Sequence, residues 1–239
     1  MKKLRLMLLL FLSCFLLVPF NTTYAKKGTQ VPVPDTVADS HSKYAAYYQV
    51  TPTRSCSAIL ISSTAALTAR HCVGHEPAQR VGTIYPGLNG DTRPFGYMNI
   101  RTFIPHPQYD IALIKGTERD QDKFYKYYIG KFTTTVRGYT DKELYAFVGQ
   151  DAYSYGYPNR SPAPKKVQYR SDGTIYKYVK TPAPILPTYM PGYNGQSGSG
   201  VFLKDGQFIG IISTKTDKNT ANALAFTEDI AEWINKNAK

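Results

Sequence analysis

Several features typical of other protein classes are absent from this sequence. After one early apolar run, from Leu6 to Phe20, no segment is long and apolar enough to cross a membrane. The 29 Lys and Arg residues, against 17 Asp and Glu, form no dense tract and accompany no nucleic-acid-binding motif. No internal repeat is detectable. Nothing in the sequence therefore indicates a multi-span membrane protein, a nucleic-acid-binding protein or a repeat architecture.

The N-terminus has the organisation of a secretory signal peptide. A basic start, Met-Lys-Lys-Leu-Arg, precedes the Leu6–Phe20 run, which is shorter than the roughly 20 residues that a membrane span needs. Thr23-Tyr24-Ala25 then offers small residues at the two positions that a signal peptidase recognises. We expect residues 1–25 to be removed and the mature protein to be secreted and extracellular, without stable membrane insertion. The alternative is an uncleaved anchor, which Ser13 and Pro19 within the short run disfavour.

The balance of charge is basic even without this leader. The formal net charge is +12, and the leader's three basic residues account for the difference from +9 in the mature chain. These charges are scattered along the sequence, which favours solubility and attraction to an anionic cell envelope over a specific polyanion site. We expect no nucleic-acid partner.

Cysteine is scarce, with three residues in 239. Cys14 lies in the leader, which leaves Cys56 and Cys72. Two cysteines without a Cys-x-x-Cys spacing are a poor ligand set for zinc, and we expect no metal. An even pair in an exported chain predicts a disulfide, worth about 3 kcal/mol for a loop of this size in the chain-entropy model.

The rest of the chain is typical of an all-β protein. Short runs rich in β-branched and aromatic residues alternate with Gly, Pro, Asn and Asp, and Asp205-Gly206 predicts a hairpin turn. The expected strands are 44–50, 57–62, 65–68, 110–115, 145–148, 174–179, 200–203 and 208–214. One amphipathic helix follows Thr227, with Glu228 and Asp229 in its first turn and Trp233 on its apolar, core-facing stripe.

These elements suggest a division of the chain into consecutive parts. The polar, Tyr- and Lys-rich stretch from about Thr117 to Gly138 is the candidate linker between two halves. The expected parts are a signal peptide (1–25), an N-terminal arm or pro-segment (26–43), an N-terminal β-barrel (44–130), a C-terminal β-barrel (131–226) and a C-terminal helix (227–239).

Three local motifs carry candidate chemistry. His71 directly precedes Cys72, so a bond to Cys56 would hold the turn that carries a general base. Asp110 begins an apolar strand, where a partly buried carboxylate needs a partner such as a His imidazole. Ser197 lies in Gly-Gln-Ser-Gly-Ser-Gly, whose small residues leave the hydroxyl accessible and let backbone N–H groups converge. Taken singly, each has an ordinary explanation: a structural His, a surface Asp that caps a strand, and a flexible loop.

Together, the motifs resemble the trypsin/chymotrypsin family of serine proteases. The family's T-A-A-H-C is T-A-R-H-C around His71, its D-I-A-L is intact from Asp110, and its G-D-S-G-G-P is G-Q-S-G-S-G around Ser197. The resemblance implies a chymotrypsin-like fold of two six-stranded antiparallel Greek-key barrels with the active site between them. It also implies a Ser-His-Asp triad, an oxyanion hole formed by the N–H groups of Gly195 and Ser197, and the Cys56–Cys72 disulfide of the histidine loop. No cofactor is implied, the substrate is a protein or peptide, and we expect a monomer.

A narrower resemblance, from about Tyr44 onward, is to the secreted staphylococcal glutamyl endopeptidases, exfoliative toxins and Spl proteases. It rests on Tyr44-Ala45-Ala46 with Gln49-Val50, Gly156-Tyr157-Pro158, Ser197-Gly198-Ser199-Gly200, Gly210-Ile211 and Ser213-Thr214-Lys215.

Departures from these relatives bear on activation and on specificity. Gln196 replaces the Asp that pairs with a new N-terminus in trypsin-like zymogens, and a neutral amide cannot make that ion pair. Gly192 and Ile212 replace the Thr and His of the glutamate-specific members, and Pro191 replaces trypsin's acidic pocket floor. We expect an uncharged residue before the cut. The expected specificity pocket comprises Gly192, Ile212, Ser213, Thr214 and Asn222, with Lys215 near the rim. Two alternatives stay open: a catalytically silent binding protein on this fold, and a protease selective for one target, like an exfoliative toxin.

Overall fold

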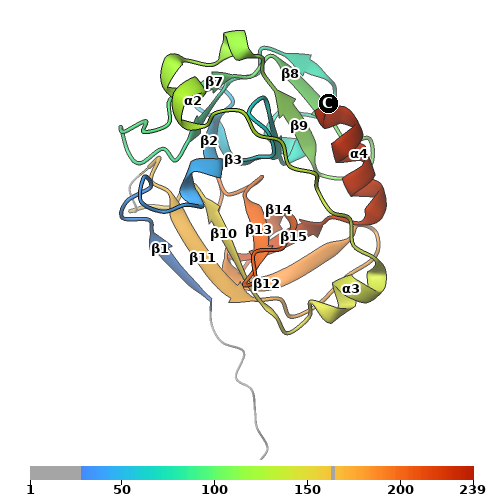
Figure 1. Cartoon of the computed structure of the whole chain (residues 1–239). Coiled ribbons are helices and arrows are strands. Elements are labelled where there is room, and N and C mark those ends of the chain that lie inside the picture. The colour runs from blue at the N-terminus through green and yellow to red at the C-terminus, as the bar shows by residue number, and fades with distance from the viewer. Residues whose placement is uncertain (1–27, 163–164) are drawn as a thin grey trace, which may run out of the picture.

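The computed structural model describes residues 28–162 and 165–239, so the expected signal peptide lies outside the described residues. Two curled antiparallel sheets form the body of the molecule, one above the other in the view of Figure 1. The strands of the upper sheet are β2 (Ala45–Gln49), β3 (Ser55–Leu60), β4 (Ala65–Thr68), β5 (Ala78–Gln79), β6 (Thr83–Pro86), β7 (Met98–Asn99), β8 (Thr102–Pro105) and β9 (Ala112–Lys115). Their order in the sheet is β5-β8-β9-β4-β3-β2-β6-β7.

The lower sheet is built from the C-terminal half of the chain and one strand from the N-terminus. Its strands are β1 (Thr29–Pro32), β10 (Asp151–Gly156), β11 (Tyr169–Thr174), β12 (Ile185–Pro191), β13 (Gly200–Leu203), β14 (Phe208–Lys215) and β15 (Thr220–Ala225). Their order is β1-β11-β10-β13-β14-β15-β12. The all-β class of chymotrypsin type is confirmed. Within the described residues the sheets have eight and seven strands, because the short β5 and β7 and the N-terminal β1 are added at their edges.

The strands carry two cores because alternate residues point to opposite faces of a sheet. On β3, Ala58 and Leu60 belong to a core inside the upper sheet, whereas Ile59 contributes to a larger core shared with the lower sheet. Leu67 and Leu113 join the shared core from the upper sheet, and Val201 joins it from the lower one. This shared apolar layer holds the two sheets together beneath the loops that carry the candidate site.

The C-terminal helix is present as α4 (Glu228–Ala238), and it lies against the upper sheet in Figure 1. Thr227 is its N-cap residue, but the hydroxyl bonds the Asp229 carboxylate instead of a backbone N–H of the first turn. Trp233 packs against the shared core, with its ring centroid 4.8 Å from that of His106. The helix therefore packs beside β9 and beside the segment that precedes β9 and contains His106. No helix among the described residues is long and apolar enough to cross a membrane.

Two predicted strands are wrong in detail. Residues 145–148 lie at the end of the helix α3 (Asp141–Ala146), which begins with a capping box in which Thr140 and Glu143 bond each other's backbone N–H. That local signal favours a helix over the strand that the aromatic residues suggested. The predicted strand 174–179 is not continuous, because β11 ends at Thr174 and beyond it Ile175 and Val179 form only isolated bridges, with Thr188 and Ile185.

The segment from Thr117 to Gly138 contains two short helices that sequence analysis did not predict. They are η3 (Glu118–Asp120) and α2 (Lys123–Tyr128). The N-cap residue of α2 is Asp122, whose carboxylate accepts the Tyr125 N–H. Tyr125 itself is fully buried in the core of the upper sheet. The predicted hairpin at Asp205-Gly206 joins β13 and β14 as expected.

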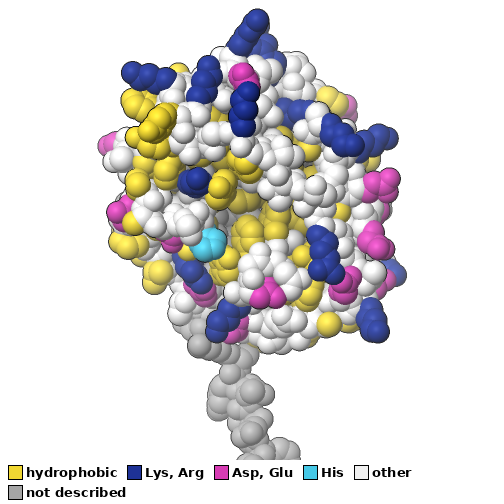
Figure 2. All heavy atoms as spheres, in the orientation of Figure 1, with side chains coloured by type: hydrophobic (Ala, Val, Ile, Leu, Met, Phe, Trp, Pro, Cys, Tyr) yellow, Lys and Arg dark blue, Asp and Glu magenta, His cyan; other side chains and the backbone are white. Residues whose placement is uncertain are grey.

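The surface charge is dispersed. Figure 2 shows Lys and Arg side chains spread over the visible face and interspersed with Asp and Glu, without one continuous basic patch on that face.

Candidate active site

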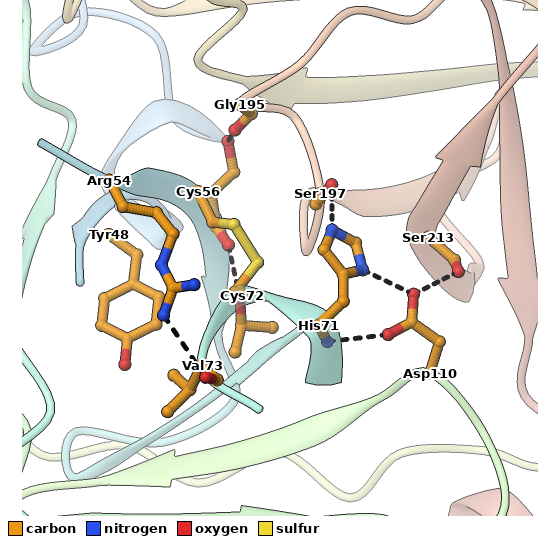
Figure 3. Close-up of a disulfide and its surroundings, with 12 residues drawn as sticks. Tyr48, Arg54, Cys56, His71, Cys72, Val73, Asp110, Gly195, Ser197 and Ser213 are labelled. Carbon is orange, nitrogen blue, oxygen red and sulfur yellow. Dashed lines mark hydrogen bonds and ion pairs between the residues drawn. A yellow bond between two sulfur atoms is a disulfide. The ribbon is translucent and has the colours of Figure 1, made fainter. Parts of the chain in front are cut away.

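The turn that carries His71 is fixed by the chain on both sides of it. Strand β4 ends at Thr68, and a single 3-10 turn, η2 (Arg70–Cys72), follows it. Cys72 is buried and forms a disulfide with Cys56 on β3, which Figure 3 shows beside the His71 turn. The imidazole is thereby projected from a short covalently closed loop. Side-chain donor atoms of Cys56, His71 and Cys72 lie within 4.8 Å of one another, but cysteines joined in a disulfide supply no thiolate for a metal.

Loss of this disulfide is expected to destabilise the protein by about 3 kcal/mol, because the bond closes a loop between residues 16 apart. The Cys56→Ala, Cys72→Ala double variant should show this loss in denaturant unfolding, and a lower kcat because the His71 turn loosens. The matched control is the wild-type protein unfolded under reducing conditions, which should lose the same stability. Two titratable thiols in the unreduced native protein would contradict the assignment.

Asp110 reaches His71 from the neighbouring strand of the same sheet. Strand β9 pairs with β4, which brings Asp110, two residues before β9, beside the turn after β4. One carboxylate oxygen accepts the His71 backbone N–H at 2.9 Å, and the other lies 2.9 Å from His71 Nδ1. The second oxygen also accepts the Ser213 hydroxyl at 2.6 Å, from β14 of the lower sheet. Burial by itself raises the pKa of Asp110, but these hydrogen bonds from His71 and Ser213 outweigh it and hold the pKa below its ordinary value.

Ser197 is the third member of this arrangement and comes from the lower sheet. Its Oγ lies 3.0 Å from His71 Nε2, so the three side chains form a continuous line from hydroxyl to carboxylate (Figure 3). The loop before it turns sharply at Gly195, where φ is +91°, and Gly198 after it has φ +90°. A Cβ at Gly198 would lie 2.2 Å from the Ser57 carbonyl oxygen. Glycine is thus required there by both conformation and close approach.

Strand β3 of the upper sheet supports the Ser197 loop directly. The Ser57 N–H donates to the Ser197 carbonyl at 2.9 Å, and the Ser57 hydroxyl donates to the Gly195 carbonyl at 2.8 Å. The same hydroxyl accepts the Tyr157 N–H at 3.0 Å. Sequence analysis missed Ser57, since nothing local distinguishes it. Because Ser57 follows Cys56, two adjacent residues of β3 fix the position of the His71 turn relative to the Ser197 loop.

Two backbone amides of the Ser197 loop, those of Gly195 and Ser197, are candidates for the oxyanion hole. The Asn194 carbonyl accepts the Asn159 N–H at 2.6 Å, and because this peptide unit is trans, the Gly195 N–H of the same unit points to the opposite side. Within residues 28–162 and 165–239, neither the Gly195 N–H nor the Ser197 N–H donates to another protein group. Both donors are therefore free for an external acceptor.

A cavity of about 540 Å³ opens beside these side chains. Of the residues expected in a specificity pocket, Gly192, Ile212, Ser213 and Thr214 line it. Asn222 is not among the lining residues; its amide donates to the Thr214 hydroxyl at 3.1 Å from the neighbouring strand. Lining residues that sequence analysis did not place in the pocket are Arg70, His75, Tyr193 and Asn194, and Lys215 also lines it. Arg70 and His75 lie far in sequence from Tyr193 and Asn194, and the fold brings these two segments together around the cavity.

The sequence model of the family described as "Trypsin-like peptidase domain" matches residues 56–211, which is well over half of the chain. The chain belongs to the trypsin-like peptidase family. Its match spans the histidine turn, Asp110 and the Ser197 loop. This trypsin-like peptidase is accordingly a serine endopeptidase that acts on protein substrates. A comparison with curated protein sequences finds no match.

Solved structures share the architecture of this trypsin-like peptidase at low sequence identity. A Glu endopeptidase solved in complex with MPD has a TM-score of 0.70 and 22% identity, and the alignment covers 88% of this chain and 97% of that chain. The protease Anisep from Arthrobacter nicotinovorans has a TM-score of 0.63 and 18% identity, with 87% and 98% covered. Neuropsin, a serine protease of mouse brain, has a TM-score of 0.60 and 18% identity, with 83% and 96% covered. At these identities the likeness establishes the fold.

Proposed function

We propose that this trypsin-like peptidase is a secreted, monomeric serine endopeptidase that uses Ser197, His71 and Asp110 as its catalytic triad. The observation that carries the proposal is the unbroken line of hydrogen-bonding atoms, with 3.0 Å between Ser197 Oγ and His71 Nε2 and 2.9 Å between His71 Nδ1 and Asp110. These distances are within the reach that a nucleophile and its general base require. Secretion is supported by the leader sequence and by a disulfide, which persists in oxidising compartments.

The steps of the reaction follow from the donors and acceptors at each atom. Asp110 accepts a hydrogen bond from the Nδ1–H of His71, which keeps that proton on Nδ1 and leaves the Nε2 lone pair free to take the proton of Ser197 Oγ. The Ser197 oxygen then attacks the peptide carbonyl carbon, and the His71 imidazolium gives its proton to the leaving amine. Water, activated by the same His71, hydrolyses the resulting acyl-enzyme. Ser213 donates to the same Asp110 oxygen as His71, which keeps the carboxylate ionised and correctly oriented.

The charge that develops on the substrate carbonyl oxygen needs its own donors. We assign the oxyanion hole to the N–H groups of Gly195 and Ser197, which have no other acceptor among the described residues. Backbone donors held in place before the reaction stabilise the oxyanion without reorganisation, and removal of one such donor typically costs about 100- to 1,000-fold in kcat.

The activity is tested by incubating the purified secreted protein with a diverse peptide library and with a fluorophosphonate probe. Cleavage products and a single covalent adduct on Ser197 are expected. A folded protein that does neither would support a catalytically silent binding protein. Labelling of Ser197 without cleavage of any library peptide would instead indicate a protease that recognises one target.

The residue before the scissile bond is expected to be uncharged: apolar, aromatic or small and polar. The Gly192, Ile212 and Thr214 part of the cavity offers neither a carboxylate nor a basic side chain, and Asp110 is already bonded to His71 and Ser213. A substrate charge buried there without a partner costs several kcal/mol, so kcat/KM should be about 100-fold lower for Glu, Lys or Arg than for Leu or Phe.

Peptides that differ only at this position measure the preference. A strong preference for Glu would contradict the proposal and would implicate Lys215, whose ammonium now bonds the Asn219 side chain at 3.0 Å. A preference for Lys or Arg would mean that the substrate side chain occupies a different part of the cavity.

A further inference from the structure

The first described residues of the chain are bound tightly to the lower sheet. Strand β1 pairs with β11, and Gln30 lies opposite Ser171 in the register. Before it, Gly28 leaves no room for a side chain, since a Cβ there would lie 2.0 Å from the Tyr189 carbonyl oxygen. After it, Val33 is buried and its N–H donates to the Gln168 carbonyl at 2.9 Å. This arm is therefore an integral strand of the sheet, at the blue end of the chain in Figure 1.

The side chain of Gln30 reaches the residue next to Ser197. Its Nε2 lies 2.8 Å from Ser171 Oγ, 3.2 Å from Gln196 Oε1 and 3.4 Å from the Pro191 carbonyl oxygen. Gln196 is fully buried, and its own Nε2 donates to Ser171 Oγ at 3.2 Å. Gln30, Ser171 and Gln196 thus form a neutral network, called here the Gln30 amide network, below the loop that carries Ser197.

This network acts on the part of the loop that supplies the proposed oxyanion donors. Gln196 lies between Gly195 and Ser197 in the chain, and its Oε1 also accepts the Tyr193 N–H at 2.8 Å. Because Gly195 has no side chain to restrict it, the anchoring of Gln196 helps to hold the direction of the two neighbouring N–H groups. Without Gln30, a buried amide oxygen of Gln196 would lose one of its two donors, which favours rearrangement of the loop.

We propose that Gln30 is a positioning residue, which acts through Gln196 to hold the Gly195 and Ser197 amides in the geometry that binds the oxyanion. The segment from Gly28 onward is then a permanent part of the active enzyme and not a pro-segment removed on activation. This inference rests on the proposed function, since it assumes that the two amides stabilise the transition state.

The first test compares Gln30→Ala with Val31→Ala. Val31 lies on the same strand and is 52% exposed, so its replacement keeps the backbone pairing and leaves the network intact. Gln30→Ala should lower kcat about tenfold with KM within about twofold, because oxyanion donors act in the transition state more than in substrate binding. Val31→Ala should match the wild type in both constants.

Gln30→Glu separates the role of the amide donor from that of side-chain volume. The two side chains have the same shape, but an ionised carboxylate accepts hydrogen bonds only and cannot donate to Gln196 Oε1 or the Pro191 carbonyl. Its kcat should be at least as low as that of Gln30→Ala. Wild-type kcat in Gln30→Glu would overturn the proposal, as would equal losses in Gln30→Ala and Val31→Ala. If Gln30→Ala does not fold, Gln30→Glu and the N-terminal analysis below decide.

The second test identifies the N-terminus of the active enzyme. Secreted protein captured by a fluorophosphonate probe is analysed by N-terminal sequencing and intact mass, and it should begin before Gln30. An active, labelled enzyme that begins after Gln30 would overturn the proposal. Absence of both labelling and cleavage in the wild-type protein would instead refute the proposed function, so the two failures are distinct.

Discussion

Replacing Ser197 by Ala is expected to lower kcat about a million-fold and to abolish labelling by a fluorophosphonate, while the protein stays folded. The Ser197 hydroxyl lies 3.0 Å from His71 Nε2 and is the proposed nucleophile, so its removal eliminates the acyl-enzyme path. Peptide cleavage assays and covalent labelling measure the loss directly. The variant removes one oxygen atom and adds nothing, so the fold should not change.

Three further variants sharpen this expectation. His71→Ala should be about as damaging as Ser197→Ala, and the double variant no worse than either, because the members of a triad act as a unit. The matched control is Ser154→Ala, a buried serine on β10 whose hydroxyl has no hydrogen-bond partner among the described residues. It should keep wild-type kcat. Labelling retained in Ser197→Ala would show that another residue is the nucleophile.

Asp110→Asn is expected to lower kcat about 10,000-fold while preserving the shape of the site. The Asp110 carboxylate accepts from His71 Nδ1 and from the Ser213 hydroxyl, at 2.9 and 2.6 Å. An amide in its place can donate to Nδ1, which favours the tautomer that carries its proton on Nε2. His71 could then no longer accept the Ser197 proton. Steady-state kinetics with a peptide substrate measure the effect.

Asp120→Asn is the matched control for this variant. Asp120 is also an ion-paired carboxylate, bonded to Arg101, and that bond lowers the pKa of Asp120 to about 2. It lies outside the cavity that contains Ser197, so its replacement should leave kcat unchanged. Wild-type kcat in Asp110→Asn, or an equal loss in Asp120→Asn, would contradict the assigned role of Asp110.

The lowered pKa of Asp110 also predicts how this variant responds to pH. A carboxyl whose pKa is lower in the folded than in the unfolded state stabilises the fold above its unfolded pKa, and that contribution disappears as pH falls through the folded pKa. The stability difference between wild type and Asp110→Asn should therefore be largest at neutral pH and shrink in acid. Denaturant unfolding at several pH values measures it.

The elements that were predicted correctly depend on local signals. Val201-Phe202-Leu203 and Phe208 flank Asp205-Gly206, a turn that forms a hairpin without help from distant residues. The acidic first turn and apolar stripe of α4 are equally local. The failure at residues 145–148 has the same origin, because aromatic residues suggested a strand while Thr140 and Glu143, just upstream, formed a capping box.

Strands β6, β8 and β12 were missed because their sequences contain Pro or lack a long β-branched run. Thr-Ile-Tyr-Pro and Ile-Leu-Pro-Thr-Tyr-Met-Pro become strands only through pairing with distant partners, and Thr-Phe-Ile-Pro does so through pairing with β9 and with β5. Strand β12, for example, pairs with β15, which begins 29 residues after β12 ends. Such pairing overrides local propensity.

The sequence by itself determined the family and the candidate triad, because their three motifs are short runs of neighbouring residues, and it determined the cysteine pair through the count of cysteines left after the leader. Only the tertiary structure decided how these motifs meet. His71 and Ser197 are 126 positions apart, and Gln30 and Gln196 are 166 apart. The supporting roles of Ser57, Ser213 and Gln30 have no local signature, since an ordinary Ser or Gln acquires its partner only when two sheets pack and an N-terminal strand closes the edge of one of them.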